Sequence, residues 1–158
     1  MASGFSVLAS KKIADGDLDL TGDTLKLMLL QDSFDWDPTV GLVDSGSGAN
    51  NAHNNECSAT GYTGGFGGSG RKTATITSTE QDGSLRTAVK LASVTWSSLG
   101  NGTNQTIQWV ALVKEITNDA ASLILCVWEV TPLTTDGSNL VLGVDSSNGN
   151  IRITTPQA

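Results

Sequence analysis

Two apolar stretches decide the fold: TIQWVALVK at residues 106–114 and LILCVWEV at residues 123–130. Each carries apolar side chains at both odd and even positions, which is typical of a strand that is buried on both faces. The residues between them include Thr117-Asn118-Asp119, which favour a turn. The two stretches are therefore predicted to be joined central strands of a β-sheet.

Shorter stretches with turn residues between them surround this central pair. Residues 85–91 alternate most clearly, with apolar Leu85, Val89 and Leu91 set against Arg86 and Lys90. Further strands are predicted at residues 24–31, 72–79, 140–144 and 151–153, with turns at residues 80–83 and 147–150. About seven short strands that do not alternate with helices indicate a mainly β chain. We expect residues 1–158 to form a single antiparallel β-sandwich or jelly-roll-like barrel.

One short helix is expected near the N-terminus, within residues 3–15. Phe5, Leu8, Ala9 and Ile13 follow the spacing of one helical face. Ser3 is the predicted N-cap, Lys11 and Lys12 lie near the C-terminal end, and Gly16 is the stop signal. A helix this short needs a partner surface, either the sheet of its own chain or a neighbouring subunit.

The charge and composition of the chain exclude several classes of protein. The net charge is −7, which argues against binding to the phosphates of nucleic acid. No apolar run reaches about 18 residues, so no membrane span is expected. The first residues place their charges after their apolar side chains, the reverse of a secretory signal. With no such signal, Cys57 and Cys126 are expected to remain reduced thiols, and Cys126 to lie in the core.

Residues 41–70 differ from the rest of the chain. They hold nine of the 18 glycines, and only Asp44 and Glu56 are charged. This composition is typical of a flexible loop. It also fits a segment that becomes ordered in an oligomer or a larger assembly.

Two stretches of the chain match known ligand-binding motifs by residue type, but neither is predicted to bind the corresponding ligand. The aspartates at 15, 17, 19 and 23 begin like a calcium loop, but its sixth and twelfth positions hold Leu20 and Lys26. A polar turn between helix and strand is the better interpretation. Gly65 to Gly70 matches a dinucleotide fingerprint by letters, but a strand, not a helix, is predicted to follow it.

Neither catalytic nor metal-binding residues stand out. The only histidine, His53, lies among asparagines in a polar loop, where a solvated surface role is expected. A hydrolytic triad would need this residue as its base. One histidine and two distant cysteines do not make a typical zinc set. We therefore expect no enzyme, no cofactor and no metal.

The four tryptophans divide into two groups. Trp109 and Trp128 fall in the central strands and are predicted to be core residues. Trp36 lies in a predicted loop beside Phe34, and Trp96 follows a predicted strand. An exposed ring at either place can stack on a sugar or contribute to an interface. An equally simple interpretation is that both rings close the ends of the sandwich.

The block ASKKIADGDLDLTGDTLKLMLL at residues 9–30 resembles the opening of a family of small tailed-bacteriophage virion proteins. In that family a short helix ends in a Lys-Lys…Asp-Gly turn, and an aspartate-rich segment leads into the first strand. Gly61-Tyr62-Thr63-Gly64-Gly65, the step Val94-Thr95-Trp96 and the strand ending Val113-Lys114 are also similar to the family. Residues 151–158 depart from its pattern.

The resemblance implies a capsid decoration or cement protein. Such a protein is assembled in the host cytoplasm, binds the major capsid protein on the surface of the virion, and forms a homotrimer at local threefold axes. The expected interface residues are Phe5, Leu8, Ile13, Trp36, Tyr62 and Phe66. The alternative is a tail or fibre-associated module that binds host glycan through Trp36 or Trp96, and a hydrolase that uses His53 is a third interpretation.

Overall fold

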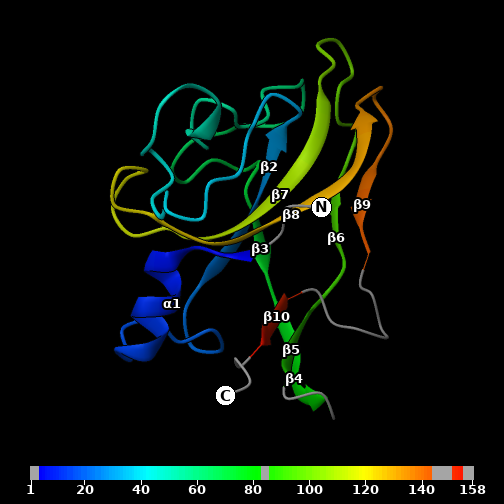
Figure 1. Cartoon of the computed structure of the whole chain (residues 1–158). Helices are drawn as coiled ribbons and strands as arrows, with labels where there is room; N and C mark the ends of the chain where they lie inside the picture. Colours follow the sequence, from blue (N-terminus) through cyan, green and yellow to red (C-terminus); the bar gives the residue numbers. More distant parts are fainter. Residues whose placement is uncertain (1–3, 83–85, 144–150, 155–158) are drawn as a thin grey trace.

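The computed structural model describes residues 4–82, 86–143 and 151–154 (Figure 1). The chain is mainly β, with one short helix, as predicted. Its elements are β1 (Gly4–Phe5), α1 (Val7–Ala14), β2 (Leu25–Gln31), the 3-10 turn η1 (Gly48–Asn50), β3 (Lys72–Ala74), β4 (Ile76–Asp82), β5 (Arg86–Leu91), β6 (Val94–Trp96), β7 (Thr106–Lys114), β8 (Leu123–Thr134), β9 (Leu140–Leu142) and β10 (Ile151–Thr154).

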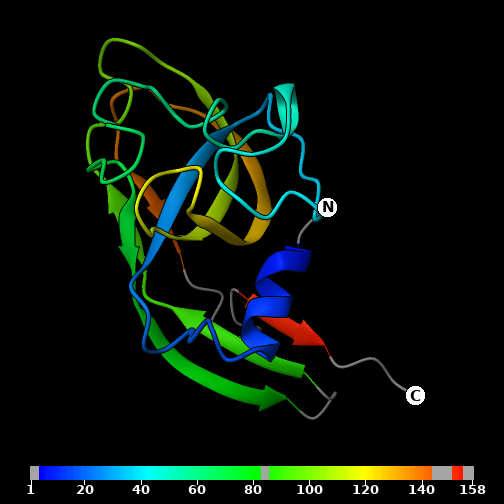
Figure 2. The same cartoon turned by 90° about the vertical axis from the view of Figure 1, so that its left-hand side faces the viewer.

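Three antiparallel sheets organise the strands. The largest has the order β1-β8-β7-β2-β3, so β7 is its central strand and β8 lies next to it. The others are β10-β5-β4 and β6-β9. In Figures 1 and 2 the β10-β5-β4 sheet extends away from the loops of residues 41–70. Over the described ranges the sheets remain open, so the arrangement is sandwich-like and the barrel alternative was wrong.

One hydrophobic core lies on the inner face of the five-stranded sheet. There Leu25, Leu27 and Leu29 of β2 are at most 1% exposed, as their alternation predicted. They pack in one cluster with Leu91 of β5 and Trp96 of β6, and helix α1 also contributes to this cluster. Burial of these side chains is worth about 1.5–3 kcal/mol for each residue of leucine size, which holds the layers together.

A second core lies on the opposite face of the same sheet. Met28 and Leu30 of β2 point to this face, together with Trp109 of β7 and Ile124 of β8. No second regular sheet covers them in the described part of the chain. The cover is an irregular segment, from which Phe34, Val43 and Ala52 are buried.

Helix α1 begins two residues later than the sequence pattern predicted. Phe5 lies in β1, where it pairs with Cys126 of β8, and the N-cap is Ser6. The Oγ of Ser6 accepts a hydrogen bond from Ala9 N at 3.0 Å and donates one to Ile124 O at 2.6 Å. Gly16, with φ +77°, follows the helix as expected. The predicted cap, Ser3, lies outside the described residues.

Several predicted strand boundaries were also wrong, among them the end of residues 140–144, since β9 stops at Leu142. Residues 72–79 form two strands in different sheets, β3 and β4, because the chain leaves the large sheet at Thr75. Residues 80–82 belong to β4 and are paired with β5, although their residue types favour a turn. Strand β8 runs four residues beyond Val130, because Leu133 and Thr134 still pair with β7. Leu85, Val144 and the predicted turn at 147–150 lie outside the described residues.

The glycine-rich segment of residues 41–70 folds against its own chain. Val43, Ala52, Cys57, Ala59 and Tyr62 are all at most 7% exposed. Cys57 and Cys126 are both buried free thiols, and burial raises the pKa of each. The segment is therefore a packed layer of the molecule and not a flexible loop. In the described ranges, the chain has no helix that is long and apolar enough to cross a membrane.

We expect Ser6→Ala to destabilise the protein by about 1–2 kcal/mol, because it removes both the cap of α1 and a bond to β8. Urea unfolding measures this change. Ser10→Ala is the control, since Ser10 is an exposed serine of the same helix whose hydroxyl makes only a local bond to Ser6 O. A midpoint of Ser6→Ala equal to that of the wild-type protein would show that the Ser6 hydroxyl contributes nothing.

Candidate functional site

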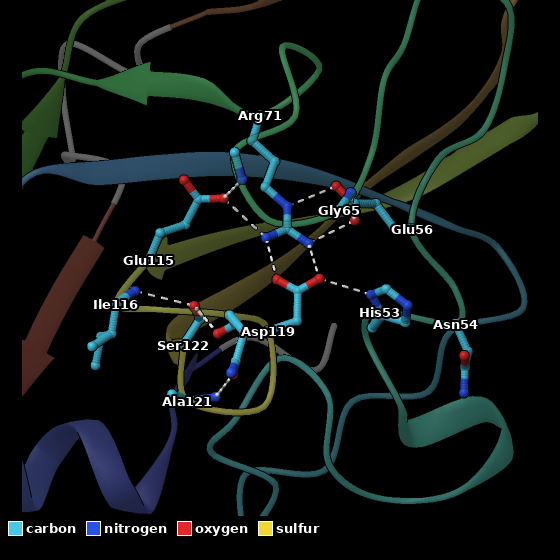
Figure 3. Close-up of polar contacts among 12 residues, drawn as sticks. His53, Asn54, Glu56, Gly65, Arg71, Glu115, Ile116, Asp119, Ala121 and Ser122 are labelled. Atoms are coloured by element: carbon cyan, nitrogen blue, oxygen red, sulfur yellow. Dashed lines mark hydrogen bonds and ion pairs between the residues drawn. The ribbon is translucent and has the colours of Figure 1, made fainter.

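A buried arginine lies where the segment of residues 41–70 meets the connection from β7 to β8 (Figure 3). The side chain of Arg71 is 0% exposed. Its Nε and Nη2 donate to the two carboxylate oxygens of Glu56 at 2.8 and 2.7 Å. Its Nη1 and Nη2 donate to those of Asp119 at 2.6 and 3.1 Å, and Nη1 also reaches Glu115 at 3.1 Å. All five N–H groups of the guanidinium are thereby used.

Residues from three separate parts of the chain meet at Arg71. Glu56 is fixed beside β2, since it forms a β-bridge with Leu30 and its neighbour Cys57 donates to Leu29 O at 2.9 Å. Arg71 immediately precedes β3. Glu115 and Asp119 lie in the connection between β7 and β8. We call Arg71, Glu56, Glu115, Asp119 and His53 the Arg71 cluster.

The carboxylates of the Arg71 cluster accept further hydrogen bonds. Glu56 accepts from the hydroxyl of Tyr62 and from Gly65 N, each at 2.9 Å. Glu115 accepts from Gly67 N at 3.0 Å. Asp119 Oδ2 lies 2.8 Å from His53 Nδ1. Each buried charge is therefore compensated by several partners, as burial in a medium of low polarity requires.

The protonation states follow from this arrangement. Burial acts to lower the pKa of Arg71, but its hydrogen bonds to Glu56 and Asp119 outweigh burial and raise the pKa. Burial acts to raise the pKa of Asp119, but the hydrogen bond from Arg71, with a smaller contribution from His53, lowers it below 3.8. Burial and the nearby Glu56 raise the pKa of Tyr62 well above its ordinary value. Tyr62 therefore remains a hydrogen-bond donor at neutral pH.

Three members of the Arg71 cluster could in principle bind a metal ion. Ligand atoms of His53, Glu56 and Asp119 lie within 4.8 Å of one another. However, Arg71 donates to both oxygens of Glu56 and to both oxygens of Asp119. A metal ion bound to these oxygens would lie against the positive guanidinium and displace its hydrogen bonds. The arginine is itself the cation of this site, and the donor set does not fit a metal.

His53 differs from its prediction in one respect. Its side chain is 44% exposed, so the ring is partly solvated as expected. The loop around it is nevertheless well organised, because His53 N donates to Val43 O at 2.9 Å and the ring contacts Asp119. A histidine beside a carboxylate is half of a hydrolytic triad. Within the described ranges, no serine, threonine or cysteine side chain forms a hydrogen bond with His53 to complete it.

The six residues predicted to form an interface lie in different environments. Phe5, Leu8 and Ile13 are half-buried against the inner core, and the surface that α1 covers belongs to its own β8. Trp36 is half-buried beside Phe34. Tyr62 is 7% exposed and its hydroxyl is bound to Glu56. Phe66, at 46% exposed, is the one of the six with a large free surface.

Of the remaining tryptophans, Trp96 and Trp109 are buried and Trp128 is half-buried. Trp96 is 1% exposed, and its Nε1 donates to Gly70 O at 2.6 Å, so it closes the core and offers no face to a sugar. Trp109 is 7% exposed and meets Phe34 edge-on, as predicted for a core residue. Trp128 packs against the inner core.

Sequence reasoning missed Arg71, Glu56, Glu115 and Asp119 as a unit. The available signal was their isolation: Glu56 is one of two charges among 30 residues, and Arg71 follows directly after that segment. Isolated charges in a chain with few charged residues are candidates for mutual pairing. Their partners are 15 to 48 positions away in the sequence, so spacing alone does not connect them.

Comparison with known proteins gives no match to a protein-family model, a curated protein or a solved structure.

We expect Arg71→Met to destabilise the protein by about 3–5 kcal/mol, because it leaves buried carboxylates without their cation. A typical domain has only about 5–15 kcal/mol of stability, so the loss is large. Chemical denaturation measures it, with Lys72→Met, at the half-exposed neighbour, as the control. If the two variants unfolded at the same denaturant concentration, the Arg71 cluster would not stabilise the fold.

Stability is expected to fall in acid because of Asp119. Its folded pKa lies below the ordinary value of 3.8, so its contribution is complete above about pH 5 and is lost as the pH falls through the folded pKa. The difference in stability between the wild-type protein and Asp119→Asn should therefore shrink from about pH 5 to about pH 2. Thermal unfolding across this range tests the expectation. The exposed Asp32→Asn is the control, and a difference for Asp119→Asn that is constant with pH would contradict it.

Proposed function

We propose that this chain is a non-enzymatic structural protein of a tailed-bacteriophage virion, which decorates the capsid by binding the major capsid protein. The observation that supports the proposal most directly is the role of residues 9–30, the block with the family resemblance. In the structure this block is one continuous unit that comprises most of α1, the aspartate-rich turn and nearly all of β2.

The aspartates of this unit have structural partners. Asp15 and Asp17 form ion pairs with Lys11 and Lys12 of α1. Asp19 accepts from Thr21 N at 2.8 Å, which closes a turn, and Asp23 forms an ion pair with Lys114 at the end of β7 at 2.7 Å. The motif that resembles the virion family therefore builds the connection between helix and sheet, and its carboxylates are engaged in the turn and not arranged as a calcium loop.

The Arg71 cluster favours a structural role over a catalytic one. A general base must be free to accept a proton from a substrate group. Here Glu56 and Asp119 each accept two hydrogen bonds from a buried guanidinium, and no substrate pocket is needed to explain their arrangement. Such a network holds the segment of residues 41–70 against the five-stranded sheet. This stabilisation suits a protein that must remain folded on the outside of a virion.

The glycan-binding alternative receives less support. Of its two candidate rings, Trp96 is buried and Trp36 is half-buried against Phe34. Stacking on a sugar requires an open ring face. We therefore retain capsid decoration as the proposed function, with a homotrimer as the proposed oligomeric state.

The proposal is tested on virions of the phage that carries this gene. We expect quantitative mass spectrometry to find the chain in purified heads, at a fixed ratio to the major capsid protein. Recovery in the tail fraction would favour the fibre-associated alternative, and absence from both fractions would overturn a virion role. Light scattering of the purified protein addresses the trimer separately, with an expected mass of three times 16.3 kDa.

A further inference from the structure

An exposed aromatic ring lies on a turn that the Arg71 cluster holds on both sides. The ring belongs to Phe66, which is 46% exposed. The residue before it, Gly65, donates its N–H to Glu56 at 2.9 Å, and the residue after it, Gly67, donates to Glu115 at 3.0 Å. Both acceptor carboxylates are bound by the same buried guanidinium. The position of Phe66 is therefore coupled to the buried ion pairs of Arg71.

The backbone of this turn, residues 63–70, is closely constrained. Gly65 and Gly67 have φ values of +81° and +71°, in the left-handed region that favours glycine. Gly68 N donates to Gly65 O and Gly70 N to Thr63 O, both at 2.9 Å. A Cβ on Gly68 would lie only 2.3 Å from Thr63 O, so the turn closes tightly on itself. The glycine-rich composition here produces a defined conformation.

We propose that the turn of residues 63–70 is a protein-docking loop, with Phe66 as the side chain that enters an apolar pocket of the partner. The partner surface is expected to place Lys or Arg side chains around that pocket. This inference rests on the proposed function, and it identifies the contact with the major capsid protein.

The charge beside the turn argues for a basic partner. The Arg71 cluster contains three carboxylates and one guanidinium, so its formal charge is negative. Glu115 and Asp119 are 14% and 8% exposed, so part of this charge reaches the surface near the turn. Complementary charge around a docking site accelerates association and selects the partner.

The constraint on the turn argues for a docking role of Phe66 in particular. A free loop must be ordered when it binds, which reduces affinity, whereas a turn already held in one conformation avoids this cost. Exposed aromatic side chains dominate binding energy at many protein interfaces. The other large apolar side chains described as exposed are all aliphatic: Val7, Ile116, Leu133 and Val141.

The test uses heads purified from phage that lack this gene, to which the purified full-length protein is added back. We expect Phe66→Ala to bind these heads about 30-fold more weakly than the wild-type protein. Binding should weaken as salt is raised from about 50 mM to about 500 mM, because screening reduces the attraction between the acidic turn and a basic surface. Val141→Ala is the matched control, since Val141 is 60% exposed and belongs to β9, far along the chain from this turn.

Each outcome has a distinct meaning. If the wild-type protein and Val141→Ala bind heads equally and Phe66→Ala binds about 30-fold more weakly, the docking loop is supported. If all three bind equally, the docking inference is overturned while the decoration function stands. If the wild-type protein does not bind heads at all, both proposals fail. Phe66→Leu, which keeps an apolar side chain, should recover part of the affinity, and thermal unfolding verifies that each variant is folded.

Discussion

The buried ion pairs of Arg71 join two parts of this molecule. On one side is the five-stranded sheet with its β7–β8 connection, and on the other is an irregular, glycine-rich segment with no regular sheet of its own in the described residues. Hydrophobic contacts hold most of that segment to the sheet, but they have little directional preference. The guanidinium, with five directed N–H groups, fixes how Glu56 and Asp119 approach each other and so defines one arrangement.

In this chain, which has few charged residues, several charges form ion pairs between different parts of the fold. Sixteen per cent of the residues are charged, and several of these charges hold elements together: Asp23 with Lys114, and Arg71 with three carboxylates. A carboxylate engaged in this way is poorly suited to proton transfer. Glu56 and Glu115 also accept hydrogen bonds from the turn around Phe66 and so fix its backbone. The Arg71 cluster therefore stabilises residues 41–70 and also positions the proposed contact with a partner.

The strands were predictable from the sequence to a large extent because their signal is local. Alternating leucines in residues 25–29 and the continuous apolar stretches at 106–114 and 123–130 report directly how many faces of each strand are buried. Boundaries were less accurate where pairing overrode residue preference. Residues 80–82 favour a turn by type, yet their pairing with β5 keeps them in a strand, and Phe5 fits a helical face yet pairs with Cys126.

The sequence by itself determined the class of this protein: a mainly β chain with one short helix and doubly buried central strands. These properties depend on neighbours within a few residues, or on composition, both of which can be read along the chain. Only the tertiary structure decided that residues 41–70 form a packed layer and that Arg71 forms buried ion pairs with Glu56 and Asp119. The physical reason is that ion pairing and desolvation depend on distances in space, and the three residues come together only after the sheet brings β2, β3 and β7 side by side.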